Sequence, residues 1–319
     1  MFDTLKTIVI GTSLSAASDD VVRTGVAIAR ATGATAWLVH AYTLPAFPSE
    51  LGTMDGSWID EYVDALRERL AQQAKRTGLT SLPGFGPSQL MPAMGPSYGE
   101  IVELARQFKA DLIVLGAAEG GAMRRMILGS TADGVIRHAS CPVFVVRSAA
   151  TFPPARVEIP VDLSPISANA LFQGMDFLNR LGAGPDGTEV LFVLNPMEIA
   201  GSLHFSPEQV ERFALSELHS FLKANDVSPA LARVRTGYPW EEILATAADR
   251  KVDLMILGTH GRRGFERLLL GSVAIGVMHR AACNLLVVPP GTRLQREELA
   301  AVADWQPSSA EVPGSAVRS

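Results

Sequence analysis

One glycine-rich loop carries the clearest chemical signal in this sequence. Residues 258–272 have the pattern Gly-x2-Gly-x9-Gly-Ser and follow an apolar, strand-like run. Glycines let the backbone turn with positive φ and bring bare N–H groups close to a ligand. Ser272 adds a hydroxyl where a helix is expected to begin, beside unpaired amides and the positive end of the helix dipole. Arg262 and Arg263 supply forked donors that suit phosphate oxygens, so the loop predicts a cradle for a small anion.

The same order of residues occurs twice in the chain. Asp111–Gly116 returns as Asp253–Gly258, at an offset of 142 residues. Twelve positions are identical between residues 116–147 and 258–289 without a gap, whereas ordinary composition would give about two by chance. A repeat of this kind decides the fold, because each copy must be a complete structural unit. The chain is therefore a tandem duplication.

Each copy alternates short apolar runs with amphipathic segments. The expected strands cover residues 7–11, 34–42, 88–93, 111–115 and 143–146, then 157–161, 189–194, 232–236, 253–257 and 285–288. The expected helices cover residues 18–32, 59–77, 98–108 and 130–139, then 166–181, 207–224, 240–249 and 272–281. Strands that are apolar throughout and alternate with helices are typical of parallel sheets covered on both faces. The predicted fold class is α/β, with two tandem Rossmann-like domains, each an open five-stranded parallel sheet with helices on both faces.

The domain boundaries follow from the repeat. We assign residues 1–147 to the first domain and residues 157–290 to the second, with a linker over residues 148–156 and a tail over residues 291–319. The two closing strands would leave apolar edges that favour aggregation. We therefore expect them to pair with each other across a pseudo-two-fold axis inside the chain, and a homodimer is a further possibility.

Composition excludes several classes of protein. The 319 residues carry a net charge of −5, with 28 Lys and Arg against 33 Asp and Glu, which argues against a nucleic-acid partner. No apolar run approaches the roughly 18–20 residues of a membrane helix, and a short apolar run near the start fits a buried strand better than a signal peptide. Two cysteines fit a reducing compartment, so we expect a cytoplasmic protein without membrane insertion.

Both copies resemble the universal stress protein family, on the spacing Gly258-x2-Gly261-x9-Gly271-Ser272 and the later Ala282-Cys283. The resemblance implies an adenine nucleotide alpha-hydrolase-like fold that binds ATP, with Asp162 at the adenine or ribose end. It also implies that Leu194 and Leu257 line the adenine pocket. The candidate nucleotide-binding set is Pro160, Val161, Asp162, Leu194, Leu257, Gly258, His260, Gly261, Arg262, Arg263, Gly271, Ser272, Val273 and Ala274.

The first copy departs from this pattern at two points. Glu119 stands where the second copy has Gly261, and Ser13 stands where the second copy has Asp162. A carboxylate in the loop adds bulk and repels phosphate. We therefore expect a degenerate nucleotide site in the first domain, with a shifted loop around Gly120-Gly121 as the alternative.

Three functions compete at this stage. The resemblance implies a stress-response regulator that binds ATP in its second domain and is not a turnover enzyme. A slow ATPase or self-phosphorylating protein that uses Ser272 or a bound Mg²⁺ is the alternative, and a ligand-free interaction scaffold is the third. The chain lacks the Gly-x4-Gly-Lys-Ser/Thr loop of P-loop ATPases and the Gly-x-Gly-x-x-Gly turn of dehydrogenases.

The remaining histidines and cysteines suggest no site of their own. The equivalent Cys141 and Cys283 are expected to be buried as small apolar residues, with redox sensing as the alternative. The histidines outside the loop show no metal-ligand spacing; they are His40, His138, His204, His219 and His279. We predict no catalytic or metal-binding residue.

Overall fold

The computed structural model describes residues 5–44, 57–118, 128–195, 206–259 and 270–290. The strands of the first half are β1 (Thr7–Gly11), β2 (Thr35–Tyr42), β3 (Leu90–Met94), β4 (Leu112–Gly116) and β5 (Val143–Val146). Those of the second half are β6 (Val157–Val161), β7 (Thr188–Leu194), β8 (Ala232–Thr236), β9 (Leu254–Gly258) and β10 (Asn284–Val288). These strands form one sheet in the order β3-β2-β1-β4-β5-β10-β9-β6-β7-β8. The predicted α/β class is confirmed, and the two five-stranded units are continuous with each other.

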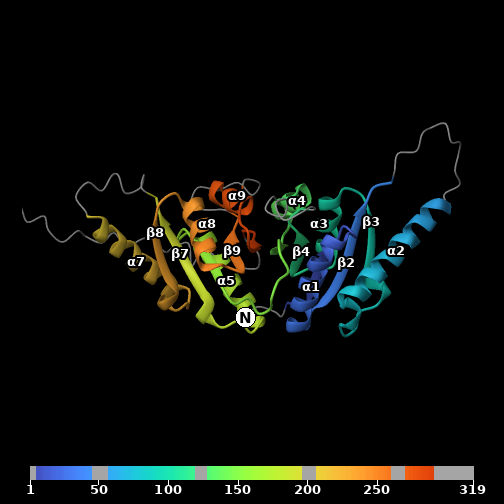
Figure 1. Cartoon of the computed structure of the whole chain (residues 1–319), viewed down its shortest axis with the longest axis horizontal. Helices are drawn as coiled ribbons and strands as arrows, with labels where there is room; N and C mark the ends of the chain where they lie inside the picture. Colours follow the sequence, from blue (N-terminus) through green and yellow to red (C-terminus); the bar gives the residue numbers. More distant parts are fainter. Residues whose placement is uncertain (1–4, 45–56, 119–127, 196–205, 260–269, 291–319) are drawn as a thin grey trace, which may run out of the picture.

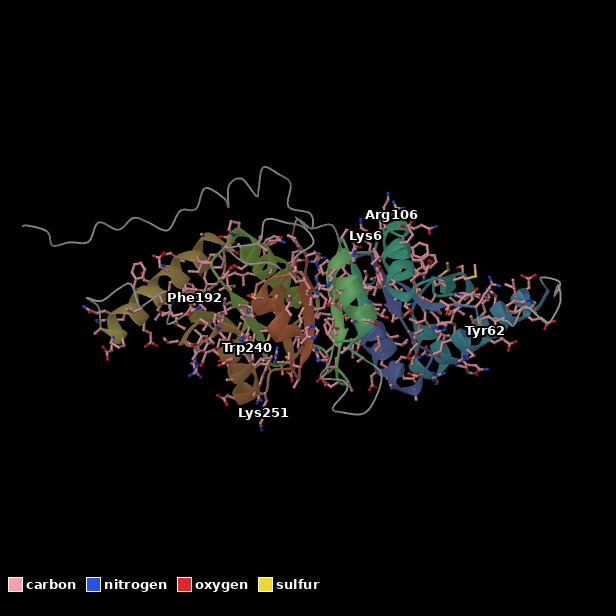
Figure 2. All side chains as sticks on the ribbon, turned by 90° about the horizontal axis from the view of Figure 1, so that it is seen from above. Lys6, Tyr62, Arg106, Phe192, Trp240 and Lys251 are labelled. Atoms are coloured by element: carbon pink, nitrogen blue, oxygen red, sulfur yellow. The ribbon has the colours of Figure 1, made fainter. Side chains whose placement is uncertain are left out.

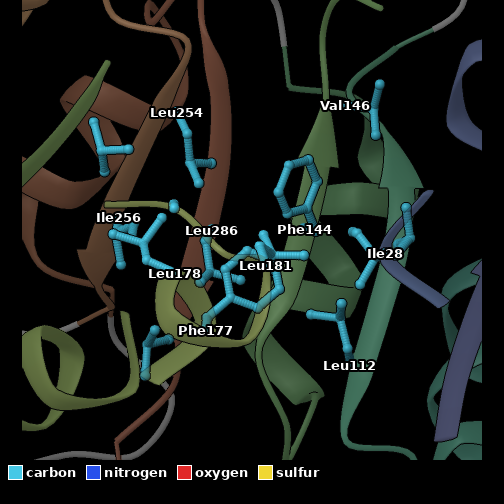
Figure 3. Close-up of a cluster of buried hydrophobic side chains, with 14 of the residues drawn as sticks. Ile28, Leu112, Phe144, Val146, Phe177, Leu178, Leu181, Leu254, Ile256 and Leu286 are labelled. Carbon is cyan, nitrogen blue, oxygen red and sulfur yellow. The ribbon is translucent and has the colours of Figure 1, made fainter. Parts of the chain in front are cut away.

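The halves meet through their closing strands. Within each half the strands are parallel, whereas β5 and β10 pair antiparallel, with Val145 opposite Leu285 and Val143 opposite Val287. Every residue of β5 and β10 is buried. The expected pairing of the two closing strands is thus confirmed. Figure 3 shows Phe144 and Leu286 in the apolar cluster at this junction.

Helices cover both faces of the sheet (Figure 1). One face packs under α1 (Asp19–Thr32), α2 (Ser57–Thr77), α5 (Pro165–Arg180) and α7 (Pro207–Ala224). The other face packs under α3 (Ser97–Gln107), α4 (Ser130–His138), α8 (Pro239–Arg250) and α9 (Ser272–Met278). The continuous apolar strands account for this arrangement, because a strand that is buried on both faces needs cover on both.

Local signals fix most helix ends. Gly33 ends α1 in the left-handed conformation at φ 72°, and Ser164 caps α5 by accepting a hydrogen bond from the Ser167 N–H. The helix expected over residues 272–281 is shorter, since α9 ends at Met278. Within the described residues, no helix is long and apolar enough to cross a membrane.

Candidate functional site

The carboxyl ends of β6 and β9 separate from each other. Strand order reverses between these two strands, which is where open α/β sheets bind ligands. The β6–β9 ladder contains two pairs, ending at Glu158 opposite Met255, whereas β6 and β7 pair over five residues. Pro160 follows in β6 and has no N–H to donate. The sequence thus leaves the sheet open at the switch point of the second half.

Asp162 lies directly beyond this opening. Its Oδ1 accepts a hydrogen bond from the Ser164 N–H at 3.0 Å, and Leu163 between them has φ 61°. Ser164 in turn caps α5. Asp162 is half-buried, so a rigid turn holds its carboxylate at the edge of the sheet.

The described ends of the glycine loop are held together. The Thr259 N–H donates to the Val288 carbonyl at 3.1 Å, and the Gly271 N–H donates to the Thr259 carbonyl at 2.9 Å. α9 then begins at Ser272, which is exposed, and Ala274 turns into the core. The loop therefore leaves and returns at one point beside β10. The predicted site residues His260, Gly261, Arg262 and Arg263 lie outside the described residues.

The other candidates sit on adjacent strand ends. Leu194 ends β7 half-buried, Val161 ends β6 buried, and Leu257 is buried near the end of β9. Gly258 follows Leu257 and ends β9. The half-buried Val273 belongs to the first turn of α9. Every described candidate thus lies at the carboxyl edge of the second half.

The corresponding edge of the first half is packed differently. The β1–β4 ladder runs over three pairs, and the Leu115 side chain lies so close over Gly11 that a Cβ there would sit 2.4 Å from Leu115 Cδ2. Ser13 is exposed, and its hydroxyl bonds with that of Ser15 at 2.9 Å. Leu115 corresponds to Leu257 of β9 and both side chains are buried, so the clearest difference at this edge is Ser13 in place of Asp162. Glu119 lies outside the described residues.

A polar network, which the sequence analysis missed, fastens this edge of the first half to α2. The Thr12 hydroxyl donates to Gln73 Oε1 at 2.8 Å, and Gln73 Nε2 donates to Asp19 Oδ1 at 2.8 Å. Arg76 donates to both Asp19 oxygens, each at 2.8 Å. The only signal in the sequence is Gln73, a polar residue among the apolar positions of α2 that the structure buries completely.

Electrostatics reinforce that network. Burial raises the pKa of the Asp19 carboxyl, but hydrogen bonds from Arg76 and Gln73 outweigh burial and hold the pKa below its usual value. Asp19 is therefore ionised at neutral pH and paired. The first half therefore has a fixed charge pair that joins α1 to α2.

Comparison with known proteins decides the family. The family model described as the Universal stress protein family matches residues 4–147 and again residues 155–289. The chain belongs to the universal stress protein family. The two successive matches make it a tandem member.

Curated relatives carry the same family name. A universal stress protein of Mycobacterium tuberculosis is 31% identical over 193 residues, which cover 59% of this chain and 64% of that protein. Another from the same organism is 25% identical over 240 residues, covering 71% and 74%. The alignment with the first relative thus spans slightly less than two thirds of its length.

Solved structures show the shared fold. A protein of unknown function from Pseudomonas aeruginosa has a TM-score of 0.61 at 16% identity, covering 94% of this chain and 96% of that chain. A universal stress protein from Archaeoglobus fulgidus has a TM-score of 0.59 at 17% identity, covering 90% and 97%. At these identities the likeness concerns architecture and not ligand.

Proposed function

We propose that the second half of this universal stress protein binds ATP at the carboxyl edge of β6, β7 and β9. The observation that carries the proposal is the position of Asp162, Leu194 and Gly258 at one edge of the sheet, beside the switch point where the β6–β9 ladder ends. Nucleotides bind in such crevices because helix starts and loop amides converge there.

The described residues divide into two groups in this proposal. Val161, Leu194 and Leu257 supply apolar surface for the adenine ring. Asp162 accepts hydrogen bonds from the ribose hydroxyls or the adenine amino group, since an ionised carboxylate is an acceptor only. The phosphates lie toward Gly271 and the exposed Ser272, next to the glycine loop.

The described residues contain no group of three or more His, Cys, Asp or Glu side chains that could hold a metal ion. We propose a nucleotide-dependent regulator of the stress response, with ATP as the bound signal, and the cytoplasmic location stays a prediction.

Titration calorimetry with ATP tests the site. Asp162→Ser copies the first half and removes the ribose acceptor, so we expect about tenfold weaker binding. The matched control Ser13→Asp should leave the affinity unchanged, because the first-half loop still carries Glu119, which repels phosphate. Mass spectrometry of the protein purified without added nucleotide should identify a bound adenine nucleotide. Equal affinity of wild type and Asp162→Ser would contradict the assignment.

A further inference from the structure

A second candidate site lies at the opposite end of the sheet from the nucleotide crevice. A cavity of about 310 Å³ opens where the amino end of β4 meets α5 of the other half. Leu112, Phe177 and Leu286 contribute its apolar wall, and Figure 3 shows these three side chains gathered at the junction of the halves. The volume is at the lower end of the roughly 300–1,000 Å³ typical of small-molecule pockets. The cavity is built by both halves together.

Charged groups of opposite sign line the deeper part of this cavity. Arg180 Nε donates to Asp176 Oδ2 at 2.7 Å, on consecutive turns of α5. The hydrogen bond that Arg180 donates to Asp176, together with the nearby Asp111 of the first half, holds the pKa of the Arg180 guanidinium above its usual value against the opposing effect of burial. Arg180 is therefore a permanent cation that faces both halves.

The mouth of the cavity is cationic. Lys109 and Arg106 line it from the end of α3. Arg106 is paired with Glu103 on the outer surface, whereas no ion pair joins Lys109 to a carboxylate among the described residues. Figure 2 labels Arg106 on the first-half side of the junction.

The charges are specific to this cavity and are not a property of the repeat. The second half has an equivalent location, related by offsets of 142 and 149 residues. The counterparts of Asp176, Arg180 and Arg106 there are Ala27, Ala31 and Ala248. Three charged side chains thus converge on one cavity at positions where the other copy has alanine.

The equivalent location is also closed by the chain itself. The linker residues 148–152 and Pro154 line a residual space of only about 50 Å³ there. Phe152 of the linker packs near Phe144, with ring centroids 6.1 Å apart. The duplicated fold therefore has one filled and one open version of the same pocket.

We propose that the open cavity binds a small amphiphilic anion. Its apolar body lies against Leu112, Phe177 and Leu286, and its acidic head meets Lys109 and Arg180. Asp176 competes with the ligand for Arg180, which sets the affinity. The shared chemistry is an anionic oxygen group on a compact apolar frame, as a carboxylate or as a phosphate monoester. This site is independent of the nucleotide crevice.

Titration by nuclear magnetic resonance with three probes tests the ligand class on the full chain. Phenylacetate supplies a carboxylate, phenyl phosphate a phosphate monoester, and benzylamine a cation on the same ring. We expect at least one anion to bind and to shift resonances of Phe177, with the tighter of the two identifying the head group. Benzylamine should not bind. Benzylamine binding as well as the anions, or no binding by either anion, would overturn the proposal.

Two variants test the location and the sign of the site. Arg180→Ala, which copies Ala31, should weaken binding of the anion about tenfold. Asp176→Ala, which copies Ala27, should strengthen anion binding severalfold because it removes the carboxylate that accepts from Arg180 Nε at 2.7 Å. An effect of the same sign from both variants would contradict the competition between Asp176 and the ligand.

A matched pair of lysines provides the control. Lys109 and Lys251 occupy equivalent turns and both have φ 52°, so Asn, which tolerates the left-handed region, replaces each at the same backbone cost. Figure 2 shows Lys251 on the side of the molecule opposite Arg106. Lys109→Asn should weaken binding of the anion, whereas Lys251→Asn should leave it unchanged. Equal effects of the two variants would show that only net charge matters and would refute the site.

Discussion

At equivalent positions between the sheet and a covering helix, the first half has an aromatic pair and the second half has an ion pair. In the first half Trp37 of β2 stacks on Phe108 at the end of α3, with ring centroids 3.8 Å apart and an interplanar angle of 11°. In the second half the equivalent positions are Glu189 of β7 and Arg250 of α8, which form an ion pair at 3.1 Å. Both arrangements are stable there, because the two rings pack against each other in the first half and the two opposite charges compensate each other in the second.

The difference extends to the central strand of each half. Val9 of β1 corresponds to Glu158 of β6, which is 0% exposed. Neither Glu158 carboxyl oxygen has a hydrogen-bond partner among the described residues. Burial raises the pKa of Glu158 to about 8, with Glu189 adding to the rise and Arg250 and Arg235 opposing it.

Each half therefore places its buried polar groups at a different end of the sheet. The first half has the network around Gln73 and Asp19 at its carboxyl edge. The second half has the cluster around Glu158 and Glu189 near the amino ends of β6 and β7. The two copies thus share the same backbone, whereas their buried polar groups lie at different ends of the sheet. The position of Asp19 is occupied by Ala168 in the second half, which retains the predicted nucleotide pattern.

The largest expected effect is on the buried carboxyl. Because the pKa of Glu158 is higher in the folded state than the ordinary value of 4.5 for a glutamate, stability is fully present below about pH 4.5 and falls as pH rises toward 8. Glu158→Gln keeps the neutral form at every pH. We expect it to change little at pH 5 and to raise the free energy of unfolding at pH 9 by at most about 5 kcal/mol, measured by urea denaturation at both pH values.

The neighbouring Glu189 and the buried Cys283 control for this effect. Burial raises the pKa of the Cys283 thiol, and Glu158 adds to the rise. The urea denaturation at both pH values is therefore repeated in a Cys283→Ala background, which lacks the thiol. Glu189→Gln breaks the ion pair with Arg250 and should destabilise at both pH values. A gain for Glu189→Gln at pH 9, or no gain for Glu158→Gln, would contradict the assigned contrast between the two carboxyls.

A smaller effect is expected on nucleotide binding. Gly261→Glu gives the second half the carboxylate that Glu119 places in the first-half loop. Repulsion of the phosphates should weaken ATP binding about a hundredfold, as measured by calorimetry. Gly261→Gln adds similar bulk without charge and separates the two causes. An unchanged affinity for ATP in Gly261→Glu would contradict the proposed position of the phosphates.

The smallest effect concerns two equivalent helix glycines. A Cβ on Gly134 would lie 2.6 Å from the Tyr98 ring, whereas on Gly276 it would lie 3.1 Å from Trp240. Alanine favours a helix over glycine by up to about 1 kcal/mol. We therefore expect Gly276→Ala to be neutral within about 0.5 kcal/mol and Gly134→Ala to destabilise by about 1 kcal/mol, compared by thermal unfolding. Equal changes in melting temperature would show that the two aromatic packings are the same.

Much of the fold could be predicted from the sequence because its signals are local. Apolar runs such as 112–115 mark strands, and Gly33 and Gly78 mark helix ends, where the left-handed conformation favours glycine. The offset of 142 residues implied two copies of one unit. The early end of α9 at Met278 was not predictable, because residues 279–282 contain no glycine or proline that would mark a helix end.

The candidate site could be predicted only in part. The order of Asp162, Leu194 and Gly271 along the chain placed them after successive strands, and the rule that parallel strands end at one edge brought them together. The polar network of Gln73 escaped notice because its members are far apart in the sequence. Long-range hydrogen bonds leave no periodic pattern.

The sequence by itself determined the duplication, the alternation of strands and helices and the predicted difference between the two loops, since these depend on residue identity and spacing. Only the tertiary structure decided that one sheet runs through both halves, that Glu158 is buried without a hydrogen bond and that one pocket at the junction is open while its counterpart is filled. These features depend on which side chains from distant segments share the same space, and packing in three dimensions settles that.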